Sequence, residues 1–362
     1  MIKKIIIVTG AAGFIGSSIV VALSKEYNII AIDQRQPTHA LIKAAPNIKW
    51  EKLDISNANK VYNTFQKIEE DLGTIDFVIH LAAYYHFGND WRIEYEKSNI
   101  RGTENIIKAS IKQRVGRIIF TSSIAAMVPP PRGDSLTEKS AVSDYFPYAK
   151  SKSEGEKIIK NASGEIPGIV LRLAGVFSDW CELPPLYSLM KLWLSSGPFS
   201  KTIPGKGESG IPYIHIIDTI RIIKRCIQLS DQLDSFEIFL ASQNGAVMHK
   251  DLFSSVTESP GNAGSVKPIY VPLELVKIGL NIKIILGSFV NKIPFEQNWM
   301  LEFIDRPWTV ENSYTQKKLD WQCKSNMNIL ERLPVILNHF KTQKNNWIER
   351  NTVRILGEYF YS

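Results

Sequence analysis

Cysteine is scarce in this chain of 362 residues, and its spacing excludes two classes of protein. The three cysteines, Cys181, Cys226 and Cys323, are odd in number, lie far apart and form no Cys-x-x-Cys pair. A disulfide framework needs paired cysteines, and a zinc site needs closely spaced ligands. The six histidines show no metal-ligand spacing either. The sequence therefore predicts reduced thiols, a cytoplasmic location and no bound metal.

Dense runs of Lys and Arg are also missing, although the net charge is +7. The scattered charge permits an anionic partner such as a nucleotide but does not indicate nucleic-acid binding. Internal repeats are absent, which excludes a solenoid or propeller. The chain is 44% hydrophobic and 22% charged, as in ordinary globular proteins. We expect one large α/β domain with an appended lobe, or two small domains.

A long uninterrupted hydrophobic run is lacking as well. Residues 5–24 carry no charge and follow two lysines, a pattern shared with signal peptides and membrane anchors. The apolar part before the first glycine is only residues 5–8, however, and three glycines follow it at a fixed interval. A short buried strand, a glycine turn and a helix explain all of these features. We therefore expect the opening of a soluble α/β domain.

The three glycines predict a turn that binds phosphate. Glycine lets the backbone turn sharply and approach a ligand closely. A helix that begins near Phe14 points its free N–H groups and its positive dipole end at an anion. The residues expected to hold a pyrophosphate are Gly10, Gly13, Phe14, Ile15 and Gly16.

Acidic residues end the next two predicted strands. Asp33 follows strand 27–32, where a carboxylate accepts hydrogen bonds from the adenosine ribose and repels a 2′-phosphate. This predicts NAD rather than NADP, although Arg35 is close enough to hold a 2′-phosphate and Asp33 is alternatively a turn cap. Asp54 follows the next strand and either bonds the adenine amino group or caps the following helix.

Alternating segments predict the architecture. Strands at 48–53, 75–81 and 117–120 are separated by helical segments, which is typical of βαβ units. The predicted fold is α/β, with a Rossmann-like doubly wound parallel sheet. In such sheets ligands bind at the carboxyl ends of the strands.

Hydroxyl and amine side chains then follow at that ligand-binding edge. Ser123 comes shortly after strand 117–120, and Tyr148 and Lys152, four residues apart, share one face of a helix. A phenol with a pKa of about 10 is a poor base until a nearby ammonium and the positive nicotinamide ring favour its phenolate. We predict Tyr148 as the acid/base, Lys152 as its activator and a ribose ligand, and Ser123 as the holder of the substrate oxygen.

These motifs stand in one order: Gly10-x-x-Gly13-x-x-Gly16, Asp33, Asp54, His80-Leu81-Ala82-Ala83, Asn99, Ser123 and Tyr148-x-x-x-Lys152. In this order the chain resembles the extended short-chain dehydrogenases/reductases of the NAD-dependent epimerase/dehydratase type. The resemblance continues to about residue 335 and implies that Asn99 helps to organise the active site. It also implies that the cofactor is contacted by Ile55, Leu81, Ala82, Ala83 and Asn99.

The resemblance also implies a division of the chain. Residues 1–175, with a returning segment near 211–242, would form the NAD-binding domain. A smaller C-terminal substrate lobe would comprise 176–210 and 243–335, followed by a helical tail at 336–362. Relatives often dimerise through two long helices, expected here at 89–113 and 147–162, so a homodimer is an expectation by analogy.

Substrate residues are indicated less directly. Tyr85 belongs to an aromatic stretch after the fourth strand that forms either an apolar substrate wall or packing between lobes. Arg306 matches a position where nucleotide-sugar enzymes of the resembled family hold diphosphate, but a surface salt bridge is an equal alternative. Ile124 and Ala125 stand where dehydratases and decarboxylases of that family carry acids, so both activities are disfavoured.

The leading prediction is an NAD-dependent oxidoreductase that acts on a secondary alcohol or ketone. A nucleotide-sugar 4-epimerase and a non-catalytic dinucleotide-binding protein are the alternatives. The stretch 269–304 is apolar but too interrupted to span a bilayer. Such stripes are usually buried core, so contact with a membrane surface is kept only as an alternative.

Overall fold

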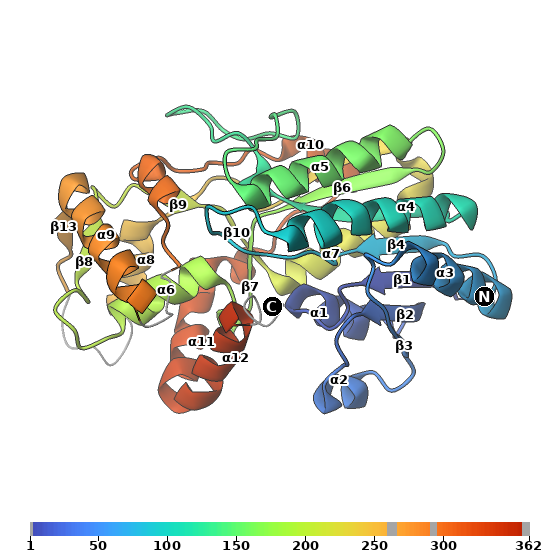
Figure 1. Ribbon diagram of the computed structural model, residues 1–362. Helices are drawn as coiled ribbons and strands as arrows, with labels where there is room; N and C mark the ends of the chain where they lie inside the picture. Colours follow the sequence, from blue (N-terminus) through green and yellow to red (C-terminus); the bar gives the residue numbers. More distant parts are fainter. Residues whose placement is uncertain (1–2, 259–265, 290–294, 357–362) are drawn as a thin grey trace.

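A seven-stranded parallel sheet forms the centre of the larger part of the molecule (Figure 1). The computed structural model describes residues 3–258, 266–289 and 295–356. The strand order is β11-β6-β5-β4-β1-β2-β3, so the chain reverses its direction of travel between β1 and β4. The strands are β1 (Ile5–Thr9), β2 (Asn28–Asp33), β3 (Lys49–Lys52), β4 (Phe77–His80), β5 (Arg117–Ser123), β6 (Gly168–Leu173) and β11 (Phe236–Ala241). The predicted Rossmann-like doubly wound sheet is confirmed.

Helices cover both faces of this sheet, which explains the uninterrupted apolar run in the first strand. Ile5 and Ile7 of β1 join one buried cluster, while Ile6 and Val8 join the other. Since both faces are dry, every strand position is apolar rather than every second one. One layer is α3 (Ala58–Leu72), α4 (Gly102–Lys112) and α5 (Pro147–Ala162); the other contains α1 (Phe14–Leu23), α7 (Ile216–Gln228) and α10 (Ser313–Leu319).

A second, mainly helical lobe lies at the carboxyl ends of the strands (Figure 1). Phe177, Met190 and Phe253 are buried in its own core. Trp347, near the end of the chain, is fully buried there too, so the last helices pack into this lobe. Its elements are α6 (Pro184–Trp193), β8 (Thr202–Pro204), α8 (His249–Thr257), β13 (Ile269–Val271), α9 (Leu273–Phe289), η4 (Asn298–Phe303), α11 (Ile329–Thr342) and α12 (Lys344–Leu356).

Short parallel and antiparallel pairs join the two parts. β10 (Tyr213–His215) pairs with β7 (Gly175–Phe177), and β12 (Val247–Met248) pairs with β9 (Gly210–Ile211). α11 spans the boundary expected near residue 335. The division drawn from the sequence stays a prediction, and residues 357–362 of the expected tail lie outside the described residues.

The apolar stretch around α9 is only partly core. Leu280 is buried, whereas Leu275, Ile278 and Ile282 are more than half exposed. Core packing therefore does not explain these three positions, and contact with a membrane surface stays a prediction. Residues 290–294 of this stretch are not described. Within the described ranges, the helices are all too short or too polar to cross a bilayer.

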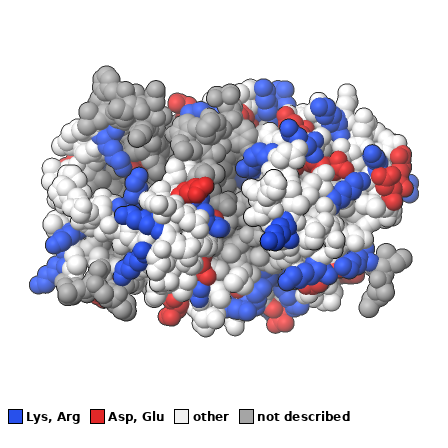
Figure 2. Space-filling view, turned by 90° about the horizontal axis from the view of Figure 1, so that it is seen from below, with Lys and Arg blue, Asp and Glu red and all other residues white. Residues whose placement is uncertain are grey.

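Charged groups of both signs are spread over the surface. On the face in Figure 2, Lys and Arg stand among Asp, Glu and uncharged residues. The helices expected to mediate a dimer, α4 and α5, pack against each other. Their exposed residues include Lys108, Lys150 and Lys157. Dimerisation through them stays a prediction.

Candidate active site

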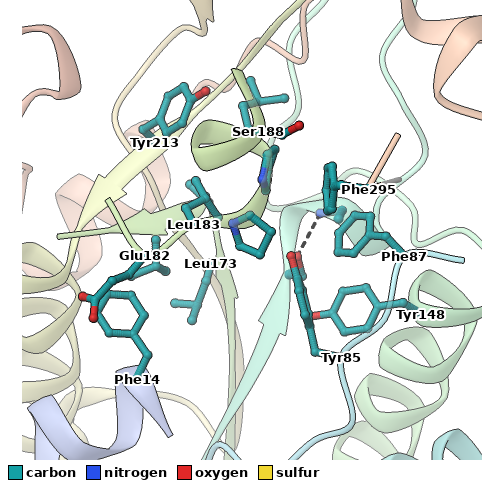
Figure 3. A pocket seen from close by; sticks show the side chains of 18 of the residues that line it. Phe14, Tyr85, Phe87, Tyr148, Leu173, Glu182, Leu183, Ser188, Tyr213 and Phe295 are labelled. Atoms are coloured by element: carbon teal, nitrogen blue, oxygen red, sulfur yellow. Dashed lines mark hydrogen bonds between the residues drawn. The ribbon is translucent and has the colours of Figure 1, made fainter. Parts of the chain in front are cut away.

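A cavity of about 1590 Å³ lies between the carboxyl edge of the sheet and the second lobe. Its walls come from the β1–α1 turn, the ends of β4 and β5, the start of α5, and α6, α9, η4 and α12. Figure 3 shows Tyr85, Phe87 and Tyr148 on one side, with Phe14, Leu173, Glu182 and Leu183 across from them. The predicted site residues that line it are Gly10, Gly13, Phe14, Ile15, Gly16, Arg35, Leu81, Ala83, Tyr85, Ser123, Tyr148, Lys152 and Arg306.

The β1–α1 turn has the geometry of an anion cradle. Gly10 has φ +69°, and a Cβ there would lie 2.7 Å from the backbone nitrogen of Ala82. A Cβ on Gly16 would collide with the carbonyl oxygen of Gly10. Helix α1 has Gly13 at its N-cap, with neither a capping side chain nor an acid in its first turn. Since this positive helix end opens into the cavity, the turn fits a pyrophosphate.

Asp33 and Arg35 form an ion pair beside this turn. The carboxylate of Asp33 accepts hydrogen bonds from the backbone nitrogens of Ala12 and Arg35, each at 2.9 Å. Arg35 Nε lies 3.1 Å from Asp33 Oδ1. Arg35 faces the cavity, whereas Asp33 is not among the described residues that line it. Asp33 thus holds the turn and the guanidinium in place.

Besides Asp33, four residues expected at the cofactor are not among the described residues that line the cavity. Asp54 is exposed and accepts a hydrogen bond from Ser56 N at 2.9 Å. The helix after it is capped by Asn57, so the capping role considered for Asp54 is wrong. Ile55 and Asn99 are buried, and Ala82 N donates to Thr9 Oγ1 at 3.2 Å.

Asn99 fastens two parts of the site together. It lies in η1 (Tyr95–Arg101), a π-helix directly before α4. Its Oδ1 accepts from Tyr84 N at 2.6 Å, and its Nδ2 donates to Tyr84 O at 2.9 Å and to Ser151 Oγ at 2.8 Å. The loop that carries Tyr85 is therefore tied to the helix that carries Tyr148. This arrangement agrees with the organising role that the resemblance implies.

Ser123, Tyr148 and Lys152 meet at the carboxyl end of β5. This strand runs through Ser123, three residues further than expected, and Ser123 Oγ accepts a hydrogen bond from Ala125 N at 3.1 Å. Helix α5 begins at Pro147, so Tyr148 lies in its first turn and Lys152 one turn later. Lys152 Nζ donates to Thr121 O at 2.9 Å. All three predicted catalytic side chains border this same cavity.

The ammonium of Lys152 is held in a poorly solvated position. Burial lowers its pKa to about 8, although the carboxylate of Glu156 opposes this change. The ammonium also lies 5.0 Å from the ring centre of Phe120. Burial, and then the charge of Lys152, lowers the pKa of His80 to about 3, so this histidine is neutral. Its ring nitrogens lie 2.7 Å from Thr9 Oγ1 and 3.0 Å from Thr103 Oγ1.

Aromatic rings surround Tyr148. Its ring centre lies 5.1 Å from that of Tyr85, edge to face, and 5.5 Å from that of Phe87. Trp299 of η4 stacks on Phe146 at 4.4 Å and donates from Nε1 to the Phe87 carbonyl at 3.1 Å. The aromatic stretch after β4 therefore fits both interpretations: Tyr85 and Phe87 line the cavity, and Phe87 also packs against Trp299 of the second lobe.

Charged groups at the lobe side of the cavity are engaged with protein partners. Arg306 Nη2 donates to the Pro130 carbonyl at 3.3 Å, and its guanidinium lies 5.6 Å from the Phe303 ring centre. Lys283 Nζ lies 2.7 Å from Glu296 Oε2. Burial works to raise the pKa of Glu296, but Lys283 and the hydroxyl of Ser188 lower it overall. Within the described residues the Arg306 guanidinium bonds this carbonyl, and the salt bridge considered for it is not found.

Several lining residues carried no recognisable signal in the sequence. Glu182 reaches the cavity from the segment between β7 and α6. Other lining residues come from α6 (Ser188), β10 (Tyr213) and η4 (Trp299 and Phe303). Glu182 has φ +50°, and Cys181 before it has φ +79°. Nothing local predicts such backbone angles for these residue types. Metal-binding groups of three or more His, Cys, Asp or Glu are not found within the described ranges.

A comparison with protein families gives one match over most of the chain. The model of the NAD dependent epimerase/dehydratase family matches residues 6–241. This range contains the glycine turn, the seven-stranded sheet except for Ile5, and the Ser123, Tyr148 and Lys152 group.

The curated relatives match a smaller part of the chain than the family model does. A dTDP-D-glucose 4,6-dehydratase of Dictyostelium discoideum is 27% identical over 241 residues, which are 60% of this chain and 54% of that protein. A 3 beta-hydroxysteroid dehydrogenase/Delta 5-->4-isomerase of Vaccinia virus is 32% identical over 170 residues, which are 44% of this chain and 46% of that one. The chain thus matches about half the length of these relatives.

Solved structures match the entire fold at low identity. A UDP-glucose 4-epimerase from Thermotoga maritima, solved with UDP-glucose, has a TM-score of 0.70 at 21% identity, covering 94% of this chain and 100% of that one. A dTDP-glucose 4,6-dehydratase from Bacillus anthracis, solved with NAD, has a TM-score of 0.71 at 16% identity, covering 96% and 99%. These likenesses support the fold, including the second lobe.

Proposed function

The chain belongs to the NAD-dependent epimerase/dehydratase family, and from its cavity we propose an oxidoreductase that interconverts a secondary alcohol and a ketone with NAD. The observation that carries this proposal is that Ser123, Tyr148 and Lys152 border the same cavity as an uncapped, glycine-rich helix end. A helix end of this kind suits the pyrophosphate of a dinucleotide. The three side chains supply proton transfer and oxygen binding beside it.

The proposed roles follow from the donors each side chain offers. When bound, NAD⁺ supplies the hydride acceptor. Tyr148 takes the proton from the substrate hydroxyl during oxidation and returns it to the carbonyl during reduction. The positive charge of Lys152 favours the phenolate form of Tyr148. One N–H of the ammonium donates to Thr121 O, and the others are left for groups bound in the site. Ser123 holds the substrate oxygen.

We infer an apolar substrate. Tyr85, Phe87 and Trp299 surround the reactive phenol, and the nearby cation of Lys283 is neutralised by Glu296. A polycyclic or long-chain alcohol needs aromatic and aliphatic walls, and the rings beside the reactive phenol supply them. The steroid dehydrogenase named among the relatives supports this class of substrate.

A nucleotide-sugar 4-epimerase is the second candidate, and Arg306 favours it. Its guanidinium lines the cavity and donates from Nη2 to the Pro130 carbonyl, so within the described residues its other N–H groups are left for a phosphate. Several structural neighbours are nucleotide-sugar epimerases. An epimerase re-reduces its own cofactor, so it would show substrate conversion without net NADH formation. The dehydratase activity is opposed by Ile124 and Ala125, since neither transfers a proton.

Removing one hydroxyl tests the proposal. We expect Tyr148→Phe to lower kcat/KM by about 100-fold or more on a panel of apolar alcohols, because acid/base transfer contributes this much. The dissociation constant for NAD⁺ should stay within about twofold. Tyr62→Phe removes a hydroxyl from the exposed face of α3 and is the matched control. NAD⁺ binding without any turnover that Tyr148→Phe abolishes would instead support the non-catalytic alternative.

A further inference from the structure

The last described helix, α12, is fixed to the segment that follows β7. Glu182 N donates to Asn351 Oδ1 at 2.7 Å, and Asn351 Nδ2 donates to Trp180 O at 2.8 Å. Trp347 of the same helix is buried in the second lobe. These contacts join residues about 170 positions apart in the sequence, so α12 is an integral part of the lobe.

An ion pair on this segment faces the cavity. Arg350 Nε and Nη2 lie 3.1 and 2.8 Å from Glu182 Oε1, and Ser178 Oγ donates to Glu182 Oε2 at 2.6 Å. The guanidinium also lies 4.9 Å from the ring centre of Trp180. The Glu182 side chain is 1% exposed and that of Arg350 is 42% exposed. Arg350 is thus held firmly by a buried carboxylate while part of it remains open.

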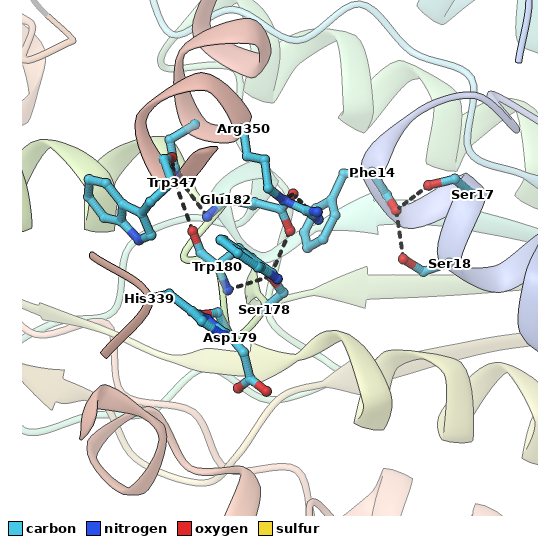
Figure 4. Close-up of polar contacts among 11 residues, drawn as sticks. Phe14, Ser17, Ser18, Ser178, Asp179, Trp180, Glu182, His339, Trp347 and Arg350 are labelled. Atoms are coloured by element: carbon cyan, nitrogen blue, oxygen red, sulfur yellow. Dashed lines mark hydrogen bonds and ion pairs between the residues drawn. The ribbon is translucent and has the colours of Figure 1, made fainter. Parts of the chain in front are cut away.

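The ion pair borders the cavity together with the first turns of α1. Arg350 and Glu182 line the same cavity as Phe14, Ser17 and Ser18 of α1. Figure 4 shows the Phe14 ring beside the Glu182 carboxylate and the Arg350 guanidinium, and Figure 3 again places Phe14 against Glu182. The ion pair of α12 and the uncapped end of α1 therefore border one space.

Charge balance gives this pair a function. A buried carboxylate beside a pyrophosphate site would repel the ligand unless a cation compensates it. Arg350 supplies that cation, and within the described chain its Nη1 makes no hydrogen bond, so donors remain for an anion.

We propose that Arg350 is a cofactor-binding residue, and that α12 completes the pyrophosphate site of the dinucleotide from outside the range matched by the family model. This inference rests on the dinucleotide binding in the proposed function, but not on any turnover.

A second ion pair in the same lobe provides the control. Arg332 of α11 lies 2.6 Å from the carboxylate of Asp179, three residues before Glu182. This pair also fastens a C-terminal helix to the segment after β7. Neither Asp179 nor Arg332 is among the described residues that line the cavity. Arg332→Ala therefore removes a comparable structural contact without removing a cation from the site.

The test is calorimetric titration of the full chain with NAD⁺, ADP-ribose and adenosine. We expect Arg350→Ala to weaken NAD⁺ and ADP-ribose, which carry the pyrophosphate, by about tenfold or more. Adenosine, which carries none, should bind within about twofold of the wild type. The NAD⁺ affinity of Arg350→Lys should lie between that of the wild type and that of Arg350→Ala, because lysine keeps the charge but lacks the planar guanidinium. Glu182→Gln combined with Arg350→Ala should recover part of the affinity, since the repelling carboxylate is gone.

Three results would overturn the inference. The first is an NAD⁺ affinity of Arg350→Ala within about twofold of the wild type. The second is a loss of adenosine affinity in Arg350→Ala as large as its loss of NAD⁺ affinity. The third is a loss of NAD⁺ affinity in Arg332→Ala as large as that in Arg350→Ala. Thermal unfolding of each variant checks that α12 remains docked. Failure of the proposed function would appear separately, as turnover that survives in Tyr148→Phe while the pyrophosphate-dependent loss in Arg350→Ala persists.

Discussion

At the scale of single residues, Lys152 combines a catalytic expectation with an energetic cost. Its ammonium is buried against Phe120 and satisfied by one carbonyl, so its pKa is lowered to about 8. In the unfolded chain a lysine titrates near 10.4. Between these two values the unfolded chain binds more protons than the folded protein does.

This difference predicts how stability responds to alkaline pH. Stability rises with pH wherever the unfolded state binds more protons, so Lys152 should add to the free energy of unfolding between about pH 8 and 10.4. We expect Lys152→Met to flatten that rise. The measurement is urea unfolding of both proteins across this range. Parallel pH profiles for the two proteins would contradict the buried-ammonium assignment.

Cofactor preference is a second property set by single residues. Asp33 lies beside the glycine turn and ties up Arg35. We expect Asp33→Ala to lower the preference for NAD⁺ over NADP⁺ by about tenfold or more, because it removes a repelling charge and releases a guanidinium. Dissociation constants for both cofactors check this. Asp54→Ala changes an exposed position outside the described cavity lining and should change neither dissociation constant. A change in either one would support the adenine contact considered for Asp54.

Residue roles could be predicted from the sequence only where spacing implies geometry. Tyr148 and Lys152 are four apart on a helix, so their shared face follows from the helical period. Asp54 follows a strand, but its side chain turns back to Ser56 N, which no spacing reveals. Glu182 and Arg350 are far apart in sequence and meet only through tertiary packing.

At the scale of elements, the β1–α1 turn is defined by backbone contacts. A Cβ on Gly16 would collide with Gly10 O, which cannot move without breaking the turn. We expect Gly16→Ala to destabilise the fold by about 2 kcal/mol or more and to abolish NAD⁺ binding. Gly164→Ala is the control, since a Cβ there meets open space. Denaturant unfolding and NAD⁺ titration of both variants test this. A Gly16→Ala variant with the stability and NAD⁺ affinity of the wild type would contradict the close contact between Gly16 and Gly10 O.

The strands of the sheet could be predicted from the sequence because both sheet faces are buried, whereas no such pattern marks η4. Strand runs such as residues 5–8 are apolar throughout because both sheet faces are buried. The wall formed by Trp299 and Phe303 has no comparable pattern, since its rings pack on Phe146 and Tyr145 from another part of the chain. The apolar stripe of the neighbouring helix α9 was expected to be buried core, but Leu275, Ile278 and Ile282 are exposed.

At the scale of the whole molecule, ligand binding should couple the two parts. The cavity is bounded by α1 from the sheet domain and by α12 from the second lobe. We expect NAD⁺ at about 100 times its dissociation constant to raise the free energy of unfolding by about 2.7 kcal/mol. Hydrogen exchange should slow both in residues 10–18 and in residues 344–352. Protection of the first segment alone would show that α12 is not part of the site.

The π-helical turn around Asn99 has a consequence for how this chain can vary. A π turn holds one residue more than an α turn. Losing a single residue between Tyr95 and Asn99 would return this turn to α winding, and the remaining residues would turn through nearly the same angle. Tyr95 could then still pack on Tyr84, and the Asn99 carboxamide could still bond the backbone of that residue and Ser151. In this stretch the loss of one residue should therefore be tolerated, whereas in a regular α-helix it would rotate all the residues that follow by about 100°.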